Sequence, residues 1–164
     1  MTFSTAPNPL VVGDLTVNGS AHAAVQFLNG NKGNDTLLGG GGNDTMSGGD
    51  GRDEMTGGAG PDLFRFAAFA DALPGADVDQ IADFFRWQDR LDFSAIDTNP
   101  DPDRQGFAFI DSAAFSAAGT EENRFVSPGT GFGVQADLDV DGVGDMAVLL
   151  STGYGALPAA DFLL

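Results

Sequence analysis

The stretch Gly30-Asn31-Lys32-Gly33-Asn34-Asp35-Thr36-Leu37-Leu38 is the first of four consecutive nine-residue units, and the last unit ends at Arg65. Every unit has glycine at the first and fourth places, aspartate at the sixth and an apolar residue at the eighth. The aspartates are Asp35, Asp44, Asp53 and Asp62, and the apolar residues are Leu37, Met46, Met55 and Phe64. A repeat of fixed length predicts a stack of equivalent structural units.

Each unit is expected to form a six-residue glycine-rich loop followed by a three-residue strand whose eighth-place residue points inward. One unit cannot bury its apolar face alone, but stacked units can. If two units make one turn of a coil, the first unit lies against the third and the second against the fourth. The sequence therefore predicts an all-β fold built on a parallel β-roll.

The loops also have the chemistry of a calcium site. Calcium takes six to eight hard oxygen ligands, and a glycine-rich turn exposes backbone carbonyls without side chains in the way. Stacked loops would bring oxygens from two turns onto one ion. We expect at least two such sites, one between loops 30–35 and 48–53 and one between loops 39–44 and 57–62.

Composition points to a cation as the partner. The chain of 164 residues has 24 acidic and 7 basic residues and a formal net charge of -17, which argues against binding to nucleic acid or to an anionic membrane surface. It has no cysteine that could form a disulfide or a thiolate metal site. It also has no apolar run long enough for a membrane span and no N-terminal signal peptide, so any export would use another signal.

The repeat resembles that of the RTX (repeats-in-toxin) family, Gly-Gly-x-Gly-x-Asp-x-apolar-x, whose members bind calcium in a β-roll. The resemblance implies that the carbonyls at places one and three join the aspartates as ligands. The implied set is Gly30, Lys32, Asp35, Gly39, Gly41, Asp44, Gly48, Asp50, Asp53, Gly57, Ala59 and Asp62. Asn31 at place two and Pro61 at place five depart from the pattern, and weaker terminal sites are expected there.

The sequence that follows the repeats contains short strand candidates around 81–84 and 90–93, and others at 107–110, 124–126, 133–136 and 146–150. The segments 79–84 and 88–94 are similar to the C-terminal lobe of serralysin-type secreted metalloproteases. We therefore divide the chain into a lead-in with a capping strand (1–28), a calcium-binding roll (29–66) and a C-terminal β-rich lobe (67–164). Asp79 is a candidate for a further metal ligand.

A second acidic segment has Asp137, Asp139, Asp141 and Asp145 at positions 1, 3, 5 and 9 of an EF-hand-like loop. Position 12 is Val148 rather than the glutamate that would bind calcium through two oxygens. The segment is either a further metal site or an acidic hairpin turn.

The chain ends Asp161-Phe162-Leu163-Leu164, an acid followed by three apolar residues. This ending resembles the uncleaved export signal of type I secretion substrates, although a buried final strand would have the same residues. Together with the repeats, it predicts a type I exporter as a partner and an extracellular location.

Catalytic residues are not expected. The only histidine is His22, so a His-Glu-x-x-His zinc site cannot form, and no Gly-x-Ser-x-Gly elbow occurs. Two alternatives to a self-contained calcium module stay open: a secretion and folding cassette of a larger secreted metalloprotease, lipase or epimerase, or an adhesin or surface-layer module. For the latter, Trp87, Phe84 and Phe85 could form a recognition patch, or they could be core.

Overall fold

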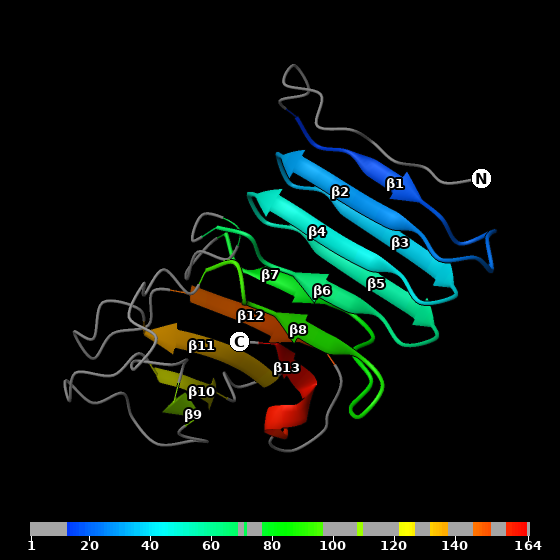
Figure 1. Ribbon diagram of the computed structural model, residues 1–164. Helices are drawn as coiled ribbons and strands as arrows, with labels where there is room; N and C mark the ends of the chain where they lie inside the picture. The colour runs from blue at the N-terminus through cyan, green and yellow to red at the C-terminus, as the bar shows by residue number, and fades with distance from the viewer. Residues whose placement is uncertain are drawn as a thin grey trace.

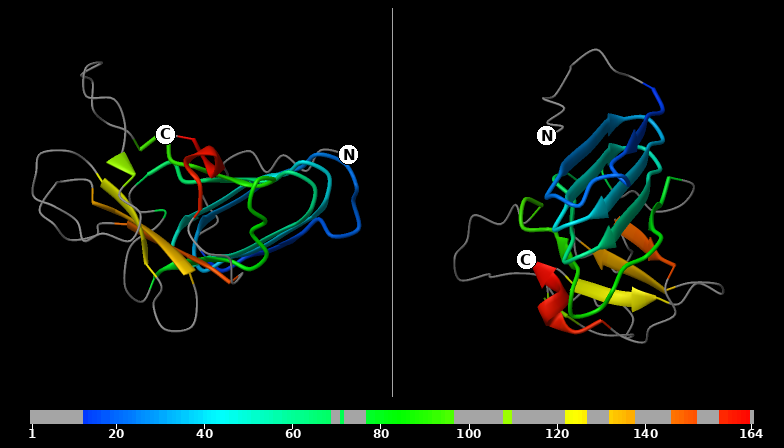
Figure 2. Two further views of the ribbon diagram at one scale, coloured as in Figure 1. Left: turned by 90° about the horizontal axis from the view of Figure 1, so that it is seen from below. Right: turned by 90° about the vertical axis from the view of Figure 1, so that its right-hand side faces the viewer.

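The computed structural model describes residues 13–68, 71, 77–96, 108–109, 122–126, 132–137, 146–151 and 157–163. Its chain coils through two β-sheets, and successive strands of the coil belong to alternate sheets (Figures 1 and 2). One sheet contains β1 (Thr16–Asn18), β3 (Thr36–Gly41), β5 (Glu54–Ala59) and β7 (Asp79–Ile81). The other contains β2 (Phe27–Lys32), β4 (Thr45–Asp50), β6 (Leu63–Arg65) and β8 (Arg90–Asp92). All of these strands pair in parallel, which confirms the predicted β-roll.

The register shows that two nine-residue units make one turn. Leu37 lies opposite Met55 and Met46 opposite Phe64, and hydrogen bonds between these turns join residues 18 apart. The strands of the central units are six residues long rather than three, because parallel pairing continues into the first three places of the next loop, as at Gly40 and Gly58.

The roll extends beyond the repeats at both ends. Val17 of β1 pairs with Leu37 before them, whereas Ile81 of β7 pairs with Met55 and Leu91 of β8 with Phe64 after them. The two strands expected in the C-terminal lobe near residues 81 and 91 therefore form a further turn of the roll. Hydrogen bonds into this turn join residues 26 and 27 apart, so its loops are longer than those of the repeats.

The C-terminal lobe continues the sheets of the roll. The strands β9 (Ala108–Phe109), β10 (Glu122–Val126), β11 (Phe132–Asp137) and β12 (Met146–Leu150) extend the first sheet, and β12 pairs in parallel with β7. A short 3-10 turn, η2 (Ala159–Asp161), leads into β13 (Phe162–Leu163), which pairs with β8 in the second sheet. A β-rich lobe thus caps one end of the roll, as predicted (Figure 1). No helix in the described part of the chain is long and apolar enough to cross a membrane.

The core consists of two columns of apolar side chains, one from each sheet. Register partners Leu28, Met46, Phe64, Leu91 and Phe162 form one column, and Val17, Leu37, Met55, Ile81 and Leu150 form the other. Each nine-residue unit adds a single side chain to the core, whereas the capped end adds aromatic contacts such as Phe66 against Phe93, with ring centroids 5.1 Å apart. On average, a residue of the repeats therefore buries less apolar surface than a residue next to the lobe.

Candidate calcium sites

The sixth-place aspartates stack in two columns joined by hydrogen bonds from turn to turn. The amide of Asp35 donates to Oδ1 of Asp53 at 2.7 Å, and the amide of Asp53 donates to Oδ1 of Asp79 at 2.8 Å. In the other column the amide of Asp44 donates to Oδ1 of Asp62 at 2.8 Å, and that of Asp62 donates to Asp89 at 3.0 Å. All six carboxylates are buried.

Asp79 and Asp89 therefore occupy the sixth-place position in the turn that follows the repeats. Asp79 was a candidate from the sequence, but Asp89 was not. The missed signal is the spacing Asp89-Arg90-Leu91, in which an aspartate precedes a core residue by two places, as in every repeat. Asp79 lies 26 residues after Asp53 and is out of phase with the nine-residue period. Asp89 lies 27 residues after Asp62 and is in phase, but no glycine precedes it at the first and fourth places.

The second carboxylate oxygen has a different environment from the first. Oδ2 of Asp35, Asp44, Asp53, Asp62 and Asp79 is buried and has no hydrogen-bond partner within the protein. A buried carboxylate oxygen without a partner is costly unless an ion or a proton satisfies it. Oδ2 of Asp89 differs, because it accepts a hydrogen bond from the amide of Phe85 at 2.7 Å.

The first-place glycines leave room for these Oδ2 atoms. A Cβ added to Gly39 would lie 2.5 Å from Oδ2 of Asp44 and 2.5 Å from the carbonyl oxygen of Gly57 in the next turn. A Cβ on Gly30 would collide in the same way with Oδ2 of Asp35 and would lie 2.5 Å from the carbonyl oxygen of Gly48. At both places a carboxylate oxygen and a carbonyl of the next turn therefore lie beside a first-place glycine.

Burial makes these carboxyl groups reluctant to ionise while no cation is bound. Desolvation is the main cause that raises the pKa of Asp53 and Asp62 to about 6 and that of Asp79 to about 8, and repulsion from neighbouring carboxylates contributes to these values. The pKa values of Asp35 and Asp44 are also raised, with burial as the main cause. A divalent cation beside Oδ2 would oppose this effect by stabilising the ionised form.

The third-place carbonyls serve to connect turns. The carbonyl oxygen of Lys32 accepts a hydrogen bond from the amide of Gly13, that of Asp50 accepts one from Gly33, and that of Ala59 accepts one from Gly42. Each oxygen retains a second lone pair. The side chain of Asp50 forms an exposed ion pair with Lys32, so it does not point at the buried carboxylate column.

The two departures from the repeat pattern fit the roll. Asn31 has φ of 77°, within the left-handed region that the second-place glycines Gly40, Gly49 and Gly58 also adopt, and asparagine tolerates this region better than most residues. Pro61 has no amide to donate, whereas the amide of Arg52 at the same place donates to Asn34. Asp62 nevertheless keeps its place in the column, because its hydrogen bonds to both neighbouring turns are intact.

The donor set fits calcium. The nearest polar atoms at these positions are oxygens: Oδ2 of a desolvated carboxylate without a partner, and a backbone carbonyl of the following turn. Within the described residues no three acidic, histidine or cysteine side chains lie close enough to hold a metal together. An ion between the loops would therefore depend on backbone carbonyls as well as on the aspartates.

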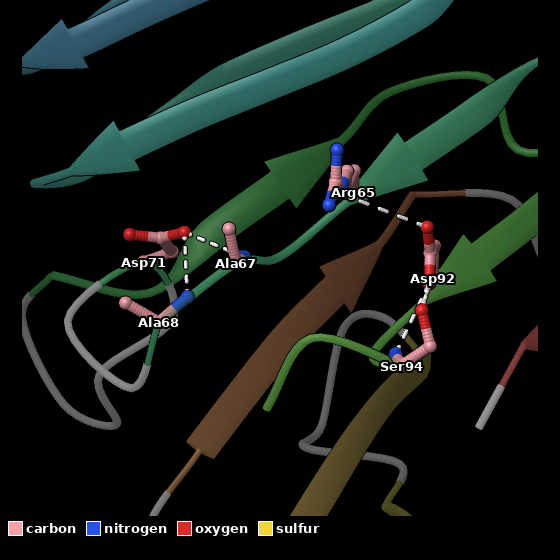
Figure 3. A network of polar contacts seen from close by, with 6 residues as sticks. All are labelled: Arg65, Ala67, Ala68, Asp71, Asp92 and Ser94. Carbon is pink, nitrogen blue, oxygen red and sulfur yellow. Dashed lines mark hydrogen bonds and ion pairs between the residues drawn. The ribbon is translucent and has the colours of Figure 1, made fainter. Parts of the chain in front are cut away.

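Two other buried aspartates are occupied by local contacts (Figure 3). Oδ2 of Asp71 accepts hydrogen bonds from the amides of Ala67 and Ala68, at 2.7 and 3.0 Å. Asp92 accepts from the amide and hydroxyl of Ser94 and lies 3.9 Å from the side chain of Arg65. Both residues organise the loops that follow β6 and β8.

The remaining sequence candidates lie outside the columns. Asp137 ends β11, whose antiparallel partner β12 begins at Met146, and Asp139, Asp141 and Asp145 lie outside the described residues. Asp161 is the buried last residue of η2, Phe162 is buried at the start of the final strand, Leu163 completes that strand, and Leu164 is not described. The three aromatic residues differ in solvent exposure, since Phe84 is fully buried whereas Phe85 and Trp87 are exposed.

The fold and these carboxylate columns together define a calcium-binding β-roll protein. Residues 28–64 match the RTX calcium-binding nonapeptide repeat in four copies. The chain belongs to this family, and its repeats are calcium-binding.

Two solved structures show the same architecture, and both are subunits of the mannuronan C5-epimerase AlgE6 from Azotobacter vinelandii. The R3 subunit is 31% identical, with a TM-score of 0.69, and the match covers 94% of this chain and 81% of that one. The R2 subunit is 30% identical, with a TM-score of 0.58, and the match covers 92% and 86% respectively. Comparison with curated proteins gives no match.

Proposed function

We propose that this chain is a non-catalytic module whose roll folds on calcium after the chain leaves the cell through a type I exporter. The observation that carries the proposal is that the four repeat aspartates in the two columns each have a buried Oδ2 atom without a partner, beside a first-place glycine. Without a cation these carboxylates oppose folding, since their ionised forms are desolvated and repel one another.

The ligands that we assign come from adjacent turns. Oδ2 of Asp35 with the carbonyls of Gly30 and Gly48 forms one site. Oδ2 of Asp44 with the carbonyls of Gly39 and Gly57 forms the other. The third-place carbonyls of Lys32, Gly41, Asp50 and Ala59 complete the implied shells. Asp53, Asp62 and Asp79 would supply carboxylates to sites nearer the C-terminal lobe.

The weakness of the repeat core makes the ion decisive. Each nine-residue unit buries only one apolar side chain, and its glycines lose much conformational entropy on folding. Binding free energy from calcium then becomes folding free energy. Extracellular calcium modules with oxygen ligands bind at about 0.1 to 1 mM, far above cytosolic calcium, so the roll would stay unfolded inside the cell and fold outside it.

Calcium titration of the chelated full chain, followed by far-UV circular dichroism, tests this proposal. Millimolar calcium should produce a cooperative gain of β signal, whereas the same concentration of magnesium should not, because magnesium keeps its waters and demands a smaller octahedral site. An unchanged spectrum in calcium would contradict calcium-driven folding.

A second candidate function is a module that serves the catalytic part of a larger enzyme. The similarity to two subunits of a mannuronan C5-epimerase favours an epimerase over the other enzyme classes. Incubating the calcium-loaded chain with mannuronan and measuring the epimer composition of the polymer by NMR tests the non-catalytic assignment that both candidate functions share. The isolated chain should leave mannuronan unchanged, and any epimerisation would refute the non-catalytic assignment.

A further inference from the structure

Gln26 occupies the sixth-place position of the turn that precedes the repeats. Its backbone amide donates to Oδ1 of Asp44 at 2.8 Å, which is the bond that each of the four repeat aspartates makes to the next turn. The residues after it, Phe27 and Leu28, pair with Thr45 and Met46, which follow Asp44. Gln26 is buried, with an exposed fraction of 2%.

Gly19 is the first-place glycine of the same turn. A Cβ on Gly19 would collide with Oε1 of Gln26 and would lie 2.6 Å from the carbonyl oxygen of Gly39. A Cβ on Gly39 meets Oδ2 of Asp44 and the carbonyl oxygen of Gly57 in the same way. The loop from Gly19 to Gln26 is two residues longer than that from Gly39 to Asp44, but the side-chain oxygen and the facing carbonyl beside Gly19 correspond to those of a candidate calcium site.

The glutamine side chain already satisfies the carbonyls at this position. Its Nε2 donates to the carbonyl oxygen of Gly39 at 2.6 Å and to that of Gly19 at 3.2 Å. Only the amide nitrogen can donate to two carbonyls, so the contacts fix the orientation of the amide group. The carbonyl of Gly19 also accepts from the amide of His22 at 2.8 Å, so both of its lone pairs are in use.

We infer that the side-chain amide of Gln26 replaces a calcium ion in this turn and holds it together without metal. The inference rests on the proposed calcium sites, since it takes the Gly19–Gly39 position as equivalent to them. A neutral amide supplies donors to two facing carbonyls and brings no net charge that would need compensation. In the column that contains Gln26, Asp44 is then the first residue that binds an ion, and the turn before it forms independently of calcium.

The ion count of the full chain, measured by isothermal titration calorimetry with calcium chloride, tests the inference. Gln26→Glu keeps the length of the side chain but replaces the donor with a second carboxylate oxygen, so the variant should bind one more calcium ion per chain than the wild type. Gln26→Met removes the hydrogen bonds at similar volume, so it should bind the same number of ions as the wild type, with a less stable fold.

Each result decides between stated alternatives. A Gln26→Glu protein that folds in calcium, as judged by circular dichroism, yet binds no additional ion would overturn the inference. So would a Gln26→Met protein that binds one ion fewer, because an ion would then have been held beside Gln26. If Gln26→Glu does not fold, the count for Gln26→Met decides alone. Absence of calcium uptake by the wild type would instead reject the proposed function.

Discussion

The amide of Asp35 donates a hydrogen bond to Oδ1 of Asp53, one turn further along the roll, at a nitrogen-to-oxygen distance of 2.7 Å. Oδ2 of the same Asp53 carboxylate is buried without a partner. One side chain therefore has two separable tasks, since Oδ1 connects consecutive turns while Oδ2 is left for a cation.

Replacing Asp53 with asparagine should separate these tasks. The variant keeps an oxygen for the amide of Asp35 but loses the charge and the free Oδ2, so the calcium midpoint for folding should rise at least about tenfold, or about 1.4 kcal/mol. Asp50→Asn is the matched control in the same loop. Its side chain is exposed and paired with Lys32, so its midpoint should change by less than about twofold. Equal shifts in the two variants would refute the assignment of Asp53 as a ligand.

Two glycine-to-alanine substitutions should show that the first-place glycine is required because a side chain has no room there, and not because of its backbone conformation. Gly39 and Gly41 lie in one loop, and neither has a positive φ. An added Cβ at Gly39 would meet a backbone carbonyl at 2.5 Å, whereas at Gly41 the nearest atom is the Cα of Ala23 at 3.4 Å. Gly39→Ala should therefore destabilise the calcium-loaded roll by about 1 to 3 kcal/mol or more, and Gly41→Ala should be nearly neutral. Urea unfolding in saturating calcium measures the stability of both variants. A Gly39→Ala variant that is as stable as the wild type would contradict the steric clash expected at Gly39.

Metal-free protein should become more stable as the pH falls. The folded-state pKa is about 6 for Asp53 and Asp62 and about 8 for Asp79, all above the ordinary value of 3.8. Between these limits the folded state binds more protons than the unfolded state. The resulting stability is complete below pH 3.8 and is lost as the pH rises through 6 and 8. The chelated chain should accordingly gain β signal in circular dichroism between pH 8 and pH 5, and an unchanged or decreasing signal would contradict this.

Calcium binding should reverse this dependence of stability on pH, because the carboxylates that bind calcium must be deprotonated. The calcium midpoint at pH 5.5 should be higher than at pH 8, and binding near neutral pH should release protons. Calorimetry at pH 7 in two buffers of different ionisation enthalpy would measure that release. A midpoint that is independent of pH would mean that the buried carboxylates do not hold the ion.

Deletion of residues 161–164 should block export through a type I exporter, and it should also loosen the capped end of the roll. Phe162 pairs with Leu91, and its ring stacks on Phe93 with centroids 6.4 Å apart. Phe93→Ala is the control, because it weakens the same core contact but leaves the whole ending in place. Secretion of the deletion variant at the wild-type level would reject the export signal, and equal loss of secretion in both variants would indicate a folding defect instead.

The repeats could be predicted from sequence because their information is local. Periodic glycine, aspartate and apolar places determine the loop, the strand direction and the inward side chain, so the parallel roll and the aspartates Asp35, Asp44, Asp53 and Asp62 follow from nine-residue spacing alone. Even the tolerance of the left-handed region at Asn31 follows from residue type.

Only the tertiary structure decided how far the roll extends and which side chains lie in the turns at its two ends. Asp89 and Gln26 take sixth-place positions 27 and 18 residues from Asp62 and Asp44, which are multiples of nine, but the residues before each lack the glycines that stand five and two places before the aspartate in every repeat. In the same way the chain ending is compatible with an export signal, yet the pairing of Phe162 with Leu91 also makes it a core strand. The physical reason is that a hydrogen-bonded register between turns depends on where backbones meet in space, and without the glycine pattern nothing in the local sequence marks these residues as part of the roll.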